Sequence, residues 1–455
     1  MFATLIVALF SGFPVAFSLA ATAAVFGIIG VASGNFTVAF LEAMTFRIQG
    51  VFNNDNLLAI PLLVFMGILM ERTGIADDMF TALNRLFGRQ PGGLAYTTII
   101  VGAVLSAITG FVSASVIAMG LIALPVMLRA GYDVRLATGV VAAAGTLAQV
   151  IPPSLVLIVL AEQLEVSLRD IYHGAMLPSL LLIGAYLAYI FAITKWRPNR
   201  APPAAISPED SWSKAKMWRE AALAAGVPLG LVLTILATVY FGVATPTEGG
   251  AIGVTATLAF GLARRKLTGR NLRQAMDITG ILLSCIIFLL LGASFFTLVF
   301  RGLDGQNWIE SLLGNMPAGA LGFVLFLNSA IFFLAFFLEF FEIAFIVLPL
   351  VAPVARQLEI DMVWLTVLLA VNLQTSFMHP PFGIALYNLR SVAPRSVRTV
   401  DLYWGAVPFL AMQLIMVVVL IVAPQVVLQN APAAVDPEKA IEIELPPMEP
   451  IDDIN

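Results

Sequence analysis

The chain has 455 residues, of which 60% are hydrophobic and only 11% charged, and its net charge is −4. Soluble globular proteins carry about 25% charged residues, so this composition excludes an ordinary water-soluble protein and predicts a polytopic membrane protein. No basic patch interleaved with aromatic residues supports nucleic-acid binding. One cysteine and two histidines exclude an internal disulfide, a cysteine cluster and a histidine-rich metal site.

The first part of the chain, 1–93, is predicted to form scaffold helices. Its apolar stretches approach the roughly 20 residues that a helix needs to cross a membrane. The chain begins without a basic n-region, so a cleavable signal peptide is not expected. Glycines interrupt this part, and the segment 36–49 is expected either to lie along the membrane interface or to cross it.

A first repeat core is predicted over 94–195. Arginine pairs flank the segment 94–130 on both sides, and the positive-inside rule places both flanks in the cytoplasm. The segment therefore leaves and returns to one face, either as two thin spans or as a re-entrant hairpin with its tip at 109–115. A long apolar helix follows over 136–163, and its tandem prolines are expected to break it because proline lacks an N–H and clashes with the preceding turn.

The remaining chain repeats this order. A basic, cytoplasmic loop is predicted over 196–220, and scaffold helices over 221–319, where Cys285 is expected to be a small core residue. The second core, 320–425, contains a hairpin (320–355, tip 338–342) whose flanks lie outside and a broken helix (362–389). The tail 426–455 is acidic and Pro-rich, so it is expected to be disordered. Without residues 431–455 the chain has 21 acidic and 23 basic residues.

A spacing of 228 residues relates the two cores. The related pairs are Pro125 and Pro353, Asp133 and Asp361, Pro152 and Pro380, and Pro153 and Pro381. Five predicted crossings separate the hairpins, and an odd number inverts the second copy, as in transporters with inverted repeats. The two aspartates are predicted to cap the helices that follow them.

The two proline breaks and the two tips are the candidate sites. Carbonyls freed at a break are tolerated in a membrane where they line an enclosed cavity, and such oxygens suit a dehydrated Na⁺. Glu339 and Glu342 would be costly at membrane depth unless paired, coordinated or protonated. Structural alternatives stay open: a packing kink, hydroxyls bonded to their own helix, glutamates in interfacial water, and a His379 that only bonds a carbonyl.

Several strings resemble the large membrane subunit of the tripartite ATP-independent periplasmic (TRAP) transporters over residues 2–425. They are SGFPVAFSLA, AIPLLVFMGILMERTGIAD, GYDVRLATGVVAAAGTLAQVIPPS, ATPTEGGAIGV and NLQTSFMHPPFGIALYNLRSVAP. The resemblance implies a multi-pass subunit of a Na⁺-driven importer of small organic acids in a bacterial inner membrane, with no cofactor besides the coupling ion. It also implies two partners, a small four-helix membrane subunit and a periplasmic substrate-binding protein, and a core that moves as an elevator.

The resemblance also assigns residues. It implies a first sodium site at Gly110, Ser113, Ser115 and Gly145 with the carbonyl of Ile151. It implies a second at Leu338, Glu342, Asn372 and Thr375 with the carbonyl of His379. The substrate would lie between the tips, against Thr109, Gln149, Ser154, Glu339, Gln374 and Ser376. The string FLEFFEIAFI resembles a branch associated with bulkier or aromatic organic acids.

Three alternative functions can be weighed against this one. A stand-alone secondary transporter or antiporter would share the repeats but need no partner subunits. A membrane enzyme would need a concentrated catalytic motif such as HExxH or GxSxG, and the sequence contains none. A passive channel would need polar faces along several helices, whereas the polar residues here gather at two central breaks.

Overall fold

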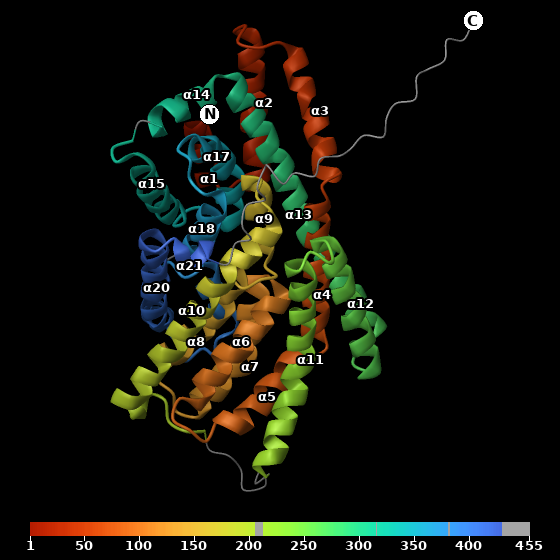
Figure 1. Cartoon of the computed structure of the whole chain (residues 1–455), viewed down its shortest axis with the longest axis vertical. Helices are drawn as coiled ribbons and strands as arrows, with labels where there is room; N and C mark the ends of the chain where they lie inside the picture. Colours follow the sequence, from red (N-terminus) through yellow and green to blue (C-terminus); the bar gives the residue numbers. More distant parts are fainter. Residues whose placement is uncertain (205–212, 315, 381–382, 430–455) are drawn as a thin grey trace, which may run out of the picture.

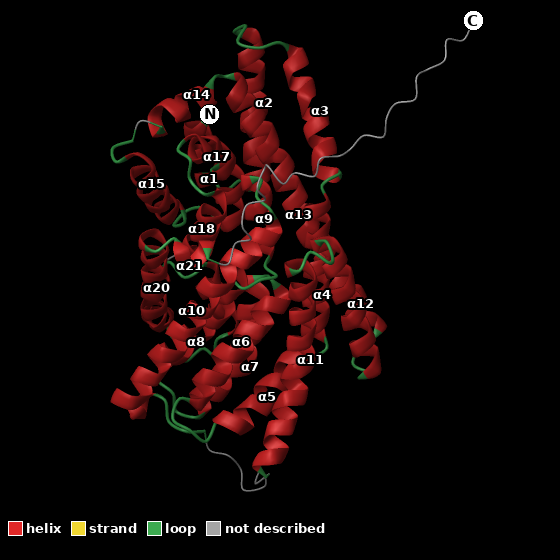
Figure 2. Ribbon diagram, in the orientation of Figure 1, coloured by secondary structure: helices red, strands yellow, loops and turns green. Residues whose placement is uncertain are grey.

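Helices and the loops between them make up the described part of the chain (Figures 1 and 2). The computed structural model describes residues 1–204, 213–314, 316–380 and 383–429, and within these residues it contains no strand. Two sequence predictions lie outside the described residues: the second proline at position 381 and the acidic tail from 430 onward. In the described part, the predicted all-α membrane architecture is confirmed.

The first half of the described chain has the following helices: α1 (Phe2–Phe10), α2 (Val15–Ala32), α3 (Val38–Phe52), α4 (Asp55–Arg72), α5 (Ile75–Phe87), α6 (Gly93–Thr109), α7 (Val112–Arg129), α8 (Val134–Thr146), η1 (Leu147–Gln149), α9 (Leu155–Leu164), α10 (Leu168–Trp196) and η2 (Pro198–Arg200). The second half has these: α11 (Lys214–Tyr240), α12 (Pro246–Ala263), α13 (Gly269–Gly302), α14 (Gly305–Leu313), α15 (Gly319–Leu334), α16 (Phe340–Ile346), α17 (Leu348–Gln357), α18 (Met362–Ser376), α19 (Ile384–Val392), α20 (Thr399–Val422) and α21 (Gln425–Leu428).

Six of the described helices are long and apolar enough to cross a membrane. They are α2, α7, α10, α11, α13 and α20. Two further pairs are bent at a short break, by 46° between α3 and α4 and by 52° between α16 and α17. The segment 36–49 thus belongs mostly to the first arm of a bent pair, not to a straight span.

Each half contains one helical hairpin followed by one broken helix and one long helix. The hairpins are α6–α7 and α15 with α16–α17; the broken helices are α8–α9 and α18–α19; the long helices are α10 and α20. In Figure 1 the first hairpin lies in the lower half of the molecule and the second in the upper half. Their tips meet at one cavity, and their places in Figure 1 show that the hairpins reach it from opposite ends, as inverted repeats require.

Two aspartates start the broken helices, as predicted. Asp133 Oδ1 accepts a hydrogen bond of 3.1 Å from the Leu136 N–H, and Asp361 Oδ1 accepts one of 2.8 Å from the Trp364 N–H. An aspartate at this position satisfies a backbone donor that the first helical turn leaves free. The repeat-related aspartates therefore fix where each broken helix begins.

A scaffold formed by both halves supports the two cores. Helix α4 packs along α12, and α2 packs along α13, so each scaffold pair joins one helix from each repeat. The scaffold meets the cores where α4 contacts α6 and α9 and where α13 contacts α16. At the first contact a Cβ on Gly67 would lie 2.6 Å from Thr109 Cα, so only glycine permits this approach.

Candidate functional site

A cavity of about 400 Å³ lies where the two hairpin tips meet the scaffold. The first tip, the start of α9 and the second tip provide its core side, while α2 and α13 close the scaffold side. Gln149, Glu339 and Glu342 are polar groups among largely apolar walls. Cavities of this size with a few convergent polar groups are the usual form of a small-molecule site.

The first tip is a tight turn at Gly110. This glycine has φ +58°, and a Cβ there would lie 3.2 Å from the Leu155 amide nitrogen, so the tip rests against the start of α9. Behind the turn, Thr109 Oγ1 and Ser115 Oγ are 2.7 Å apart and both buried. Ser113, in the first turn of α7, lines the cavity instead.

The end of α8 fits closely against the start of α7. A Cβ on Gly145 would lie 2.9 Å from the Val116 amide nitrogen, so the two helices touch at this glycine. On the neighbouring α6, Ser106 Oγ donates a 3.0 Å hydrogen bond to the Ala144 carbonyl. Gly145 therefore serves the close packing of tip and break, behind the cavity wall.

Hydroxyl groups bond to two carbonyls at the first break. Helix α8 ends at Thr146, six positions before the first proline. Ser154 Oγ donates to the Gln149 carbonyl (2.8 Å) and accepts from the Val156 N–H, which caps α9, and Ser179 Oγ donates to the Val150 carbonyl (2.8 Å). These bonds leave the Gln149 side chain as the polar group that faces the cavity.

Gln149 is only 1% exposed and lines the cavity. Its Oε1 atom has no hydrogen-bond partner among the described residues. A buried amide oxygen without a partner is destabilising unless something in the adjacent space bonds to it. This oxygen is therefore a strong candidate for contact with a bound ion or substrate.

The second tip ends in a reciprocal cap made by two glutamates. The Glu339 N–H donates a 2.9 Å hydrogen bond to Glu342 Oε2, and the Glu339 carboxylate accepts from the backbone of Glu342. Glu339 is exposed and Glu342 is half-buried, and both line the cavity. The carboxylates thus start α16 and place negative charge at the cavity edge.

Asn372 and Thr375 make the second break compact. Asn372 Nδ2 donates to the Asn328 carbonyl (2.8 Å) and to Asn328 Oδ1 (3.1 Å), which ties α18 to α15. Thr375 Oγ1 donates to the Asn372 carbonyl (2.6 Å), and Ser376 Oγ donates to the Leu373 carbonyl (2.6 Å). Three of the four predicted polar groups on this helix are therefore held by its own surroundings.

The structure contradicts the alternative that the His379 side chain only hydrogen-bonds a carbonyl. Its ring is 4.3 Å from the Phe332 ring and 4.6 Å from the Phe336 ring, measured between centroids. Neither ring nitrogen has a hydrogen-bond partner among the described residues, so the carbonyl contact expected for the imidazole is not formed. The ring packs as an aromatic, while the His379 carbonyl accepts a 2.6 Å hydrogen bond from Gly383.

The structure brings some of the predicted residues to the cavity and not others. Five of them line it: Gly110, Ser113, Gln149, Glu339 and Glu342. Leu338 and Ser376 line a smaller neighbouring cavity of about 140 Å³, which Glu339 also borders. The others lie behind these walls: Thr109, Ser115, Gly145, Ile151, Ser154, Asn372, Gln374, Thr375 and His379.

The scaffold side of the cavity was not predicted. Phe17 of α2 and Phe288 of α13 stack edge to face at 4.9 Å between centroids and line it. Cys285, predicted to be a core residue, is exposed and lines the same wall. The sequence prediction was wrong because an apolar helix next to a cavity and one in a packed core have the same composition.

A buried polar cluster lies at the centre of the core, and only its Gln374 was among the predicted residues, as a substrate contact. Gln374 Nε2 is 3.5 Å from Thr146 Oγ1, and Gln413 Nε2 donates a 2.9 Å hydrogen bond to the Tyr186 hydroxyl. All four side chains are fully buried. Thr146 and Gln374 lie 228 positions apart, so the repeat spacing relates this pair, whereas Tyr186 and Gln413 lie 227 apart and do not follow it.

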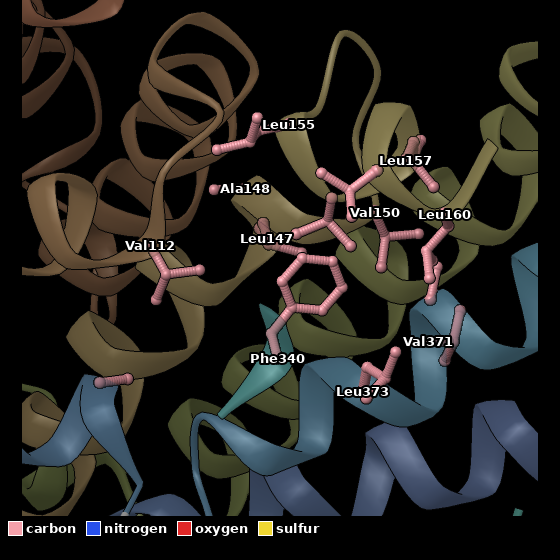
Figure 3. Close-up of a cluster of buried hydrophobic side chains, with 14 of the residues drawn as sticks. Val112, Leu147, Ala148, Val150, Leu155, Leu157, Leu160, Phe340, Val371 and Leu373 are labelled. Atoms are coloured by element: carbon pink, nitrogen blue, oxygen red, sulfur yellow. The ribbon is translucent and has the colours of Figure 1, made fainter. Parts of the chain in front are cut away.

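Apolar side chains hold the two tips and the two broken helices together (Figure 3). The cluster contains Val112 of the first tip, Leu147 of the first break, Phe340 of the second tip and Leu373 of α18. All four side chains are at most 3% exposed. Burying a large apolar side chain contributes about 1.5–3 kcal/mol, so this cluster fixes the geometry of the polar groups around it.

Comparison with known proteins identifies relatives of most of the chain. The family described as "Tripartite ATP-independent periplasmic transporter, DctM component" matches residues 2–426. The chain is 27% identical to the ectoine/5-hydroxyectoine TRAP transporter large permease protein UehC of Ruegeria pomeroyi, over 94% of this chain and 97% of that protein. It is 26% identical to the C4-dicarboxylate TRAP transporter large permease protein DctM of Pseudomonas aeruginosa, over 86% and 90%.

Another relative is longer than this chain. The sialic acid TRAP transporter permease protein SiaT of Haemophilus influenzae is 25% identical over 85% of the chain, which spans only 61% of that protein. Among solved structures, the YdaH transporter of Alcanivorax borkumensis has a similar fold, with a TM-score of 0.60 and 16% identity. That similarity covers 86% of this chain and 90% of YdaH.

Proposed function

Since the chain belongs to the family of DctM components of the tripartite ATP-independent periplasmic transporters, we propose that it is the large subunit of a Na⁺-coupled importer of small organic acids. It acts in a bacterial inner membrane with a small four-helix membrane subunit and a periplasmic substrate-binding protein. One observation carries the proposal: two inverted hairpin tips and two broken helices meet at one cavity beside the scaffold.

Sodium would bind at the edges of this cavity. The first proposed site uses the turn at Gly110, the hydroxyls of Ser113 and Ser115, and the break after Gly145. The second uses the turn at Leu338 and the carboxylate of Glu342, with Asn372, Thr375 and the His379 carbonyl. Backbone and hydroxyl oxygens suit a hard cation, and irregular backbone inside a membrane protein is the usual source of them.

The charges of the cavity suggest why the ion and the substrate are coupled. Among its described lining residues the charged side chains are Glu339 and Glu342, both acidic. An organic anion entering alone would be repelled across a short distance in a medium of low dielectric constant. A Na⁺ bound at Glu342 neutralises one of the two negative charges and reduces this repulsion, so binding of the acid depends on prior binding of Na⁺.

The apolar walls favour an acid that carries an apolar body. Phe17, Phe288, Phe340 and Phe341 all line the cavity. The permeases that resemble the chain are named for sialic acid, ectoine and C4-dicarboxylates, which supports the class of organic acid without choosing one. The aromatic walls contact the apolar part of the substrate, in addition to the groups that recognise its carboxylate. Bulky acids are therefore preferred over small dicarboxylates.

Movement of the core past the scaffold would carry the cavity across the membrane. The scaffold pairs α4–α12 and α2–α13 each join the two repeats, while the hairpins and broken helices pack mainly on one another. In this elevator mechanism the tips, the breaks and the bound solutes move together as one body.

Reconstitution tests the proposal. The chain, the small subunit and the binding protein encoded nearby are placed in proteoliposomes, and uptake of organic acids is measured with and without an inward Na⁺ gradient. Uptake that requires all three proteins and the gradient is expected. Uptake that ignores the gradient would refute the coupling. Uptake by the chain alone would instead favour the stand-alone transporter.

A further inference from the structure

A second polar cavity of about 280 Å³ lies between the scaffold and the core. Arg47 of α3 and Arg301 of α13 line it from the scaffold, and Glu162 and Glu165 at the end of α9 line it from the core. Phe345 of α16 completes the wall. None of these residues belongs to the proposed sodium or substrate sites.

This cavity adjoins the cavity between the tips. On α13, Leu289 lines the tip cavity, and Leu290 and Ser294 line the arginine cavity. On α16, Glu342 lines the first and Phe345 the second. One helical turn is about 5.4 Å, so the two cavities follow each other along the same two helices.

The direction of α13 places the arginine cavity on the outer side. This helix begins at Gly269, next to the basic segment 264–273, which the positive-inside rule assigns to the cytoplasm. Arg301 lies at the opposite end of the same helix. A solute that arrives from outside therefore meets the arginine cavity before the tip cavity.

Among the described residues, neither Arg47 nor Arg301 forms an ion pair with the glutamates that share its cavity. The positive charges of the two arginines repel each other. Arg47 Nη1 donates a 3.3 Å hydrogen bond to the Ser294 carbonyl. Most N–H donors of the two guanidinium groups thus have no partner among the described residues, and such donors suit an anion in the cavity.

The acidic side chains of the cavity are held by other groups. Glu165 Oε2 is 2.7 Å from Arg356 Nη2, in an ion pair at the surface of the core. Glu162 Oε1 accepts a 2.5 Å hydrogen bond from Asn54 Nδ2. Asn54 is a neutral donor, so Glu162 keeps its charge, whereas Arg356 neutralises Glu165. The two arginines therefore face the charge of one carboxylate, that of Glu162, which leaves one positive charge for a ligand.

We propose that Arg47 and Arg301 form an entry site for the carboxylate of the substrate, occupied before the substrate reaches the tip cavity. This inference rests on the proposed function, because it assumes that the solute is an organic acid. A guanidinium binds a carboxylate with two parallel hydrogen bonds, which gives both attraction and orientation. The acidic tip cavity then receives the acid only when Na⁺ is bound there.

Binding to the purified complex with the small subunit tests the entry site. Phenylacetate and succinate are the probes, and neutral phenylacetamide is the control ligand. The expected result is that Arg301→Gln and Arg47→Gln each weaken carboxylate binding about tenfold, which corresponds to 1.4 kcal/mol. Phenylacetamide binding stays unchanged. Arg301→Gln is the cleaner variant. Arg47 also donates a hydrogen bond to the Ser294 carbonyl, whereas the Arg301 side chain has no hydrogen bond within the described residues.

Two further variants separate charge from structure. Arg301→Lys keeps the positive charge but loses the planar guanidinium that donates two parallel hydrogen bonds. It is expected to weaken carboxylate binding less than Arg301→Gln does. Arg270→Gln, an exposed position at the other end of α13, should bind as the native complex does. Equal carboxylate affinity in the native complex and both glutamine variants overturns the proposal, as does a native complex that binds neither carboxylate.

Transport kinetics distinguish an entry site from a mechanical latch. An entry site predicts that the arginine variants raise KM for uptake and keep kcat at saturating substrate. A fall in kcat with KM unchanged would show that the arginines only join scaffold and core, and would overturn the inference. If the native complex binds carboxylates but shows no Na⁺-driven uptake, the proposed function fails and the anion site stands.

Discussion

At the residue scale, the polar side chains near the two breaks divide into two groups. Ser154, Thr375 and Ser376 donate to nearby carbonyls and complete the local backbone. Ser113 and Gln149 face the cavity instead. The first group thus serves the backbone of the breaks, and we expect the second group to contact ligands. At the first tip, where hydroxyls bonded to their own helix were the open alternative, Thr109 and Ser115 bond to each other instead.

Ser113→Ala tests the first sodium site. Removing one hydroxyl ligand is expected to raise the Na⁺ concentration for half-maximal uptake several-fold. A contact as strong as a hydrogen bond contributes about 1 kcal/mol to the free energy of ion binding. Since the side chain is half-exposed, the melting temperature should not change. Ser391→Ala, at an exposed serine of α19, is the matched control. An unchanged Na⁺ titration would remove Ser113 from the site.

Asn372→Ala is expected to lower stability as well as Na⁺ affinity. The variant leaves Oδ1 of buried Asn328 without its 3.1 Å partner, while the Asn328 carbonyl keeps its bond within α15. Leaving a buried acceptor unpaired destabilises a protein by about 1–3 kcal/mol. Thermal unfolding of the purified complex measures this. A variant as stable as the native protein would contradict the structural role, and an unchanged Na⁺ titration would contradict the ligand role.

At the scale of elements, the helix breaks begin earlier than the prolines. Helix α8 ends at Thr146 and α18 at Ser376, six and four positions before Pro152 and Pro380. The prolines alone therefore do not set the ends of the helices. Tertiary contacts contribute, since the Val150 carbonyl at the first break is bonded by Ser179 of α10.

The contact between α4 and the first tip is predicted to need a residue without a side chain. In Gly67→Ala the new Cβ would lie 2.6 Å from Thr109 Cα, so α4 and the tip must separate. Overpacking of this kind destabilises by about 1–3 kcal/mol, and we expect reduced uptake with a lower melting temperature. Gly280→Ala, on α13 with open space around its Cβ, is the control. Equal uptake by both variants would show that this contact is loose.

At the scale of the whole molecule, scaffold and core meet at the cavity, and only the core is proposed to move. Cys285 offers a probe, because it is exposed on the scaffold wall and is the single cysteine of the chain. Labelling with N-ethylmaleimide is expected to block uptake, since the added group occupies the space that the substrate needs.

Cys285→Ser is the control for this experiment. It should transport normally and resist the reagent, and prior incubation with Na⁺ and substrate should slow labelling of the native protein. Mass spectrometry checks the extent of modification. Full uptake by a protein that is completely labelled at Cys285 would place the transport path elsewhere.

The sequence by itself determined the all-helical membrane fold, the two inverted repeats and the caps at Asp133 and Asp361. These features depend on composition, on spacing along the chain and on local hydrogen bonds, which can be read from neighbouring residues. The breaks of the two helices were predicted for the same reason, although not their first residues.

Only the tertiary structure decided which polar groups face the cavity, that Cys285 borders it, and that Thr146 meets Gln374 at the centre of the core. The arginine cavity likewise joins α3, α9 and α13, which are far apart in the chain. The physical reason is the same in each case. A side chain's role depends on whether packing from distant helices fills the space beside it, and an apolar sequence gives the same local pattern in both situations.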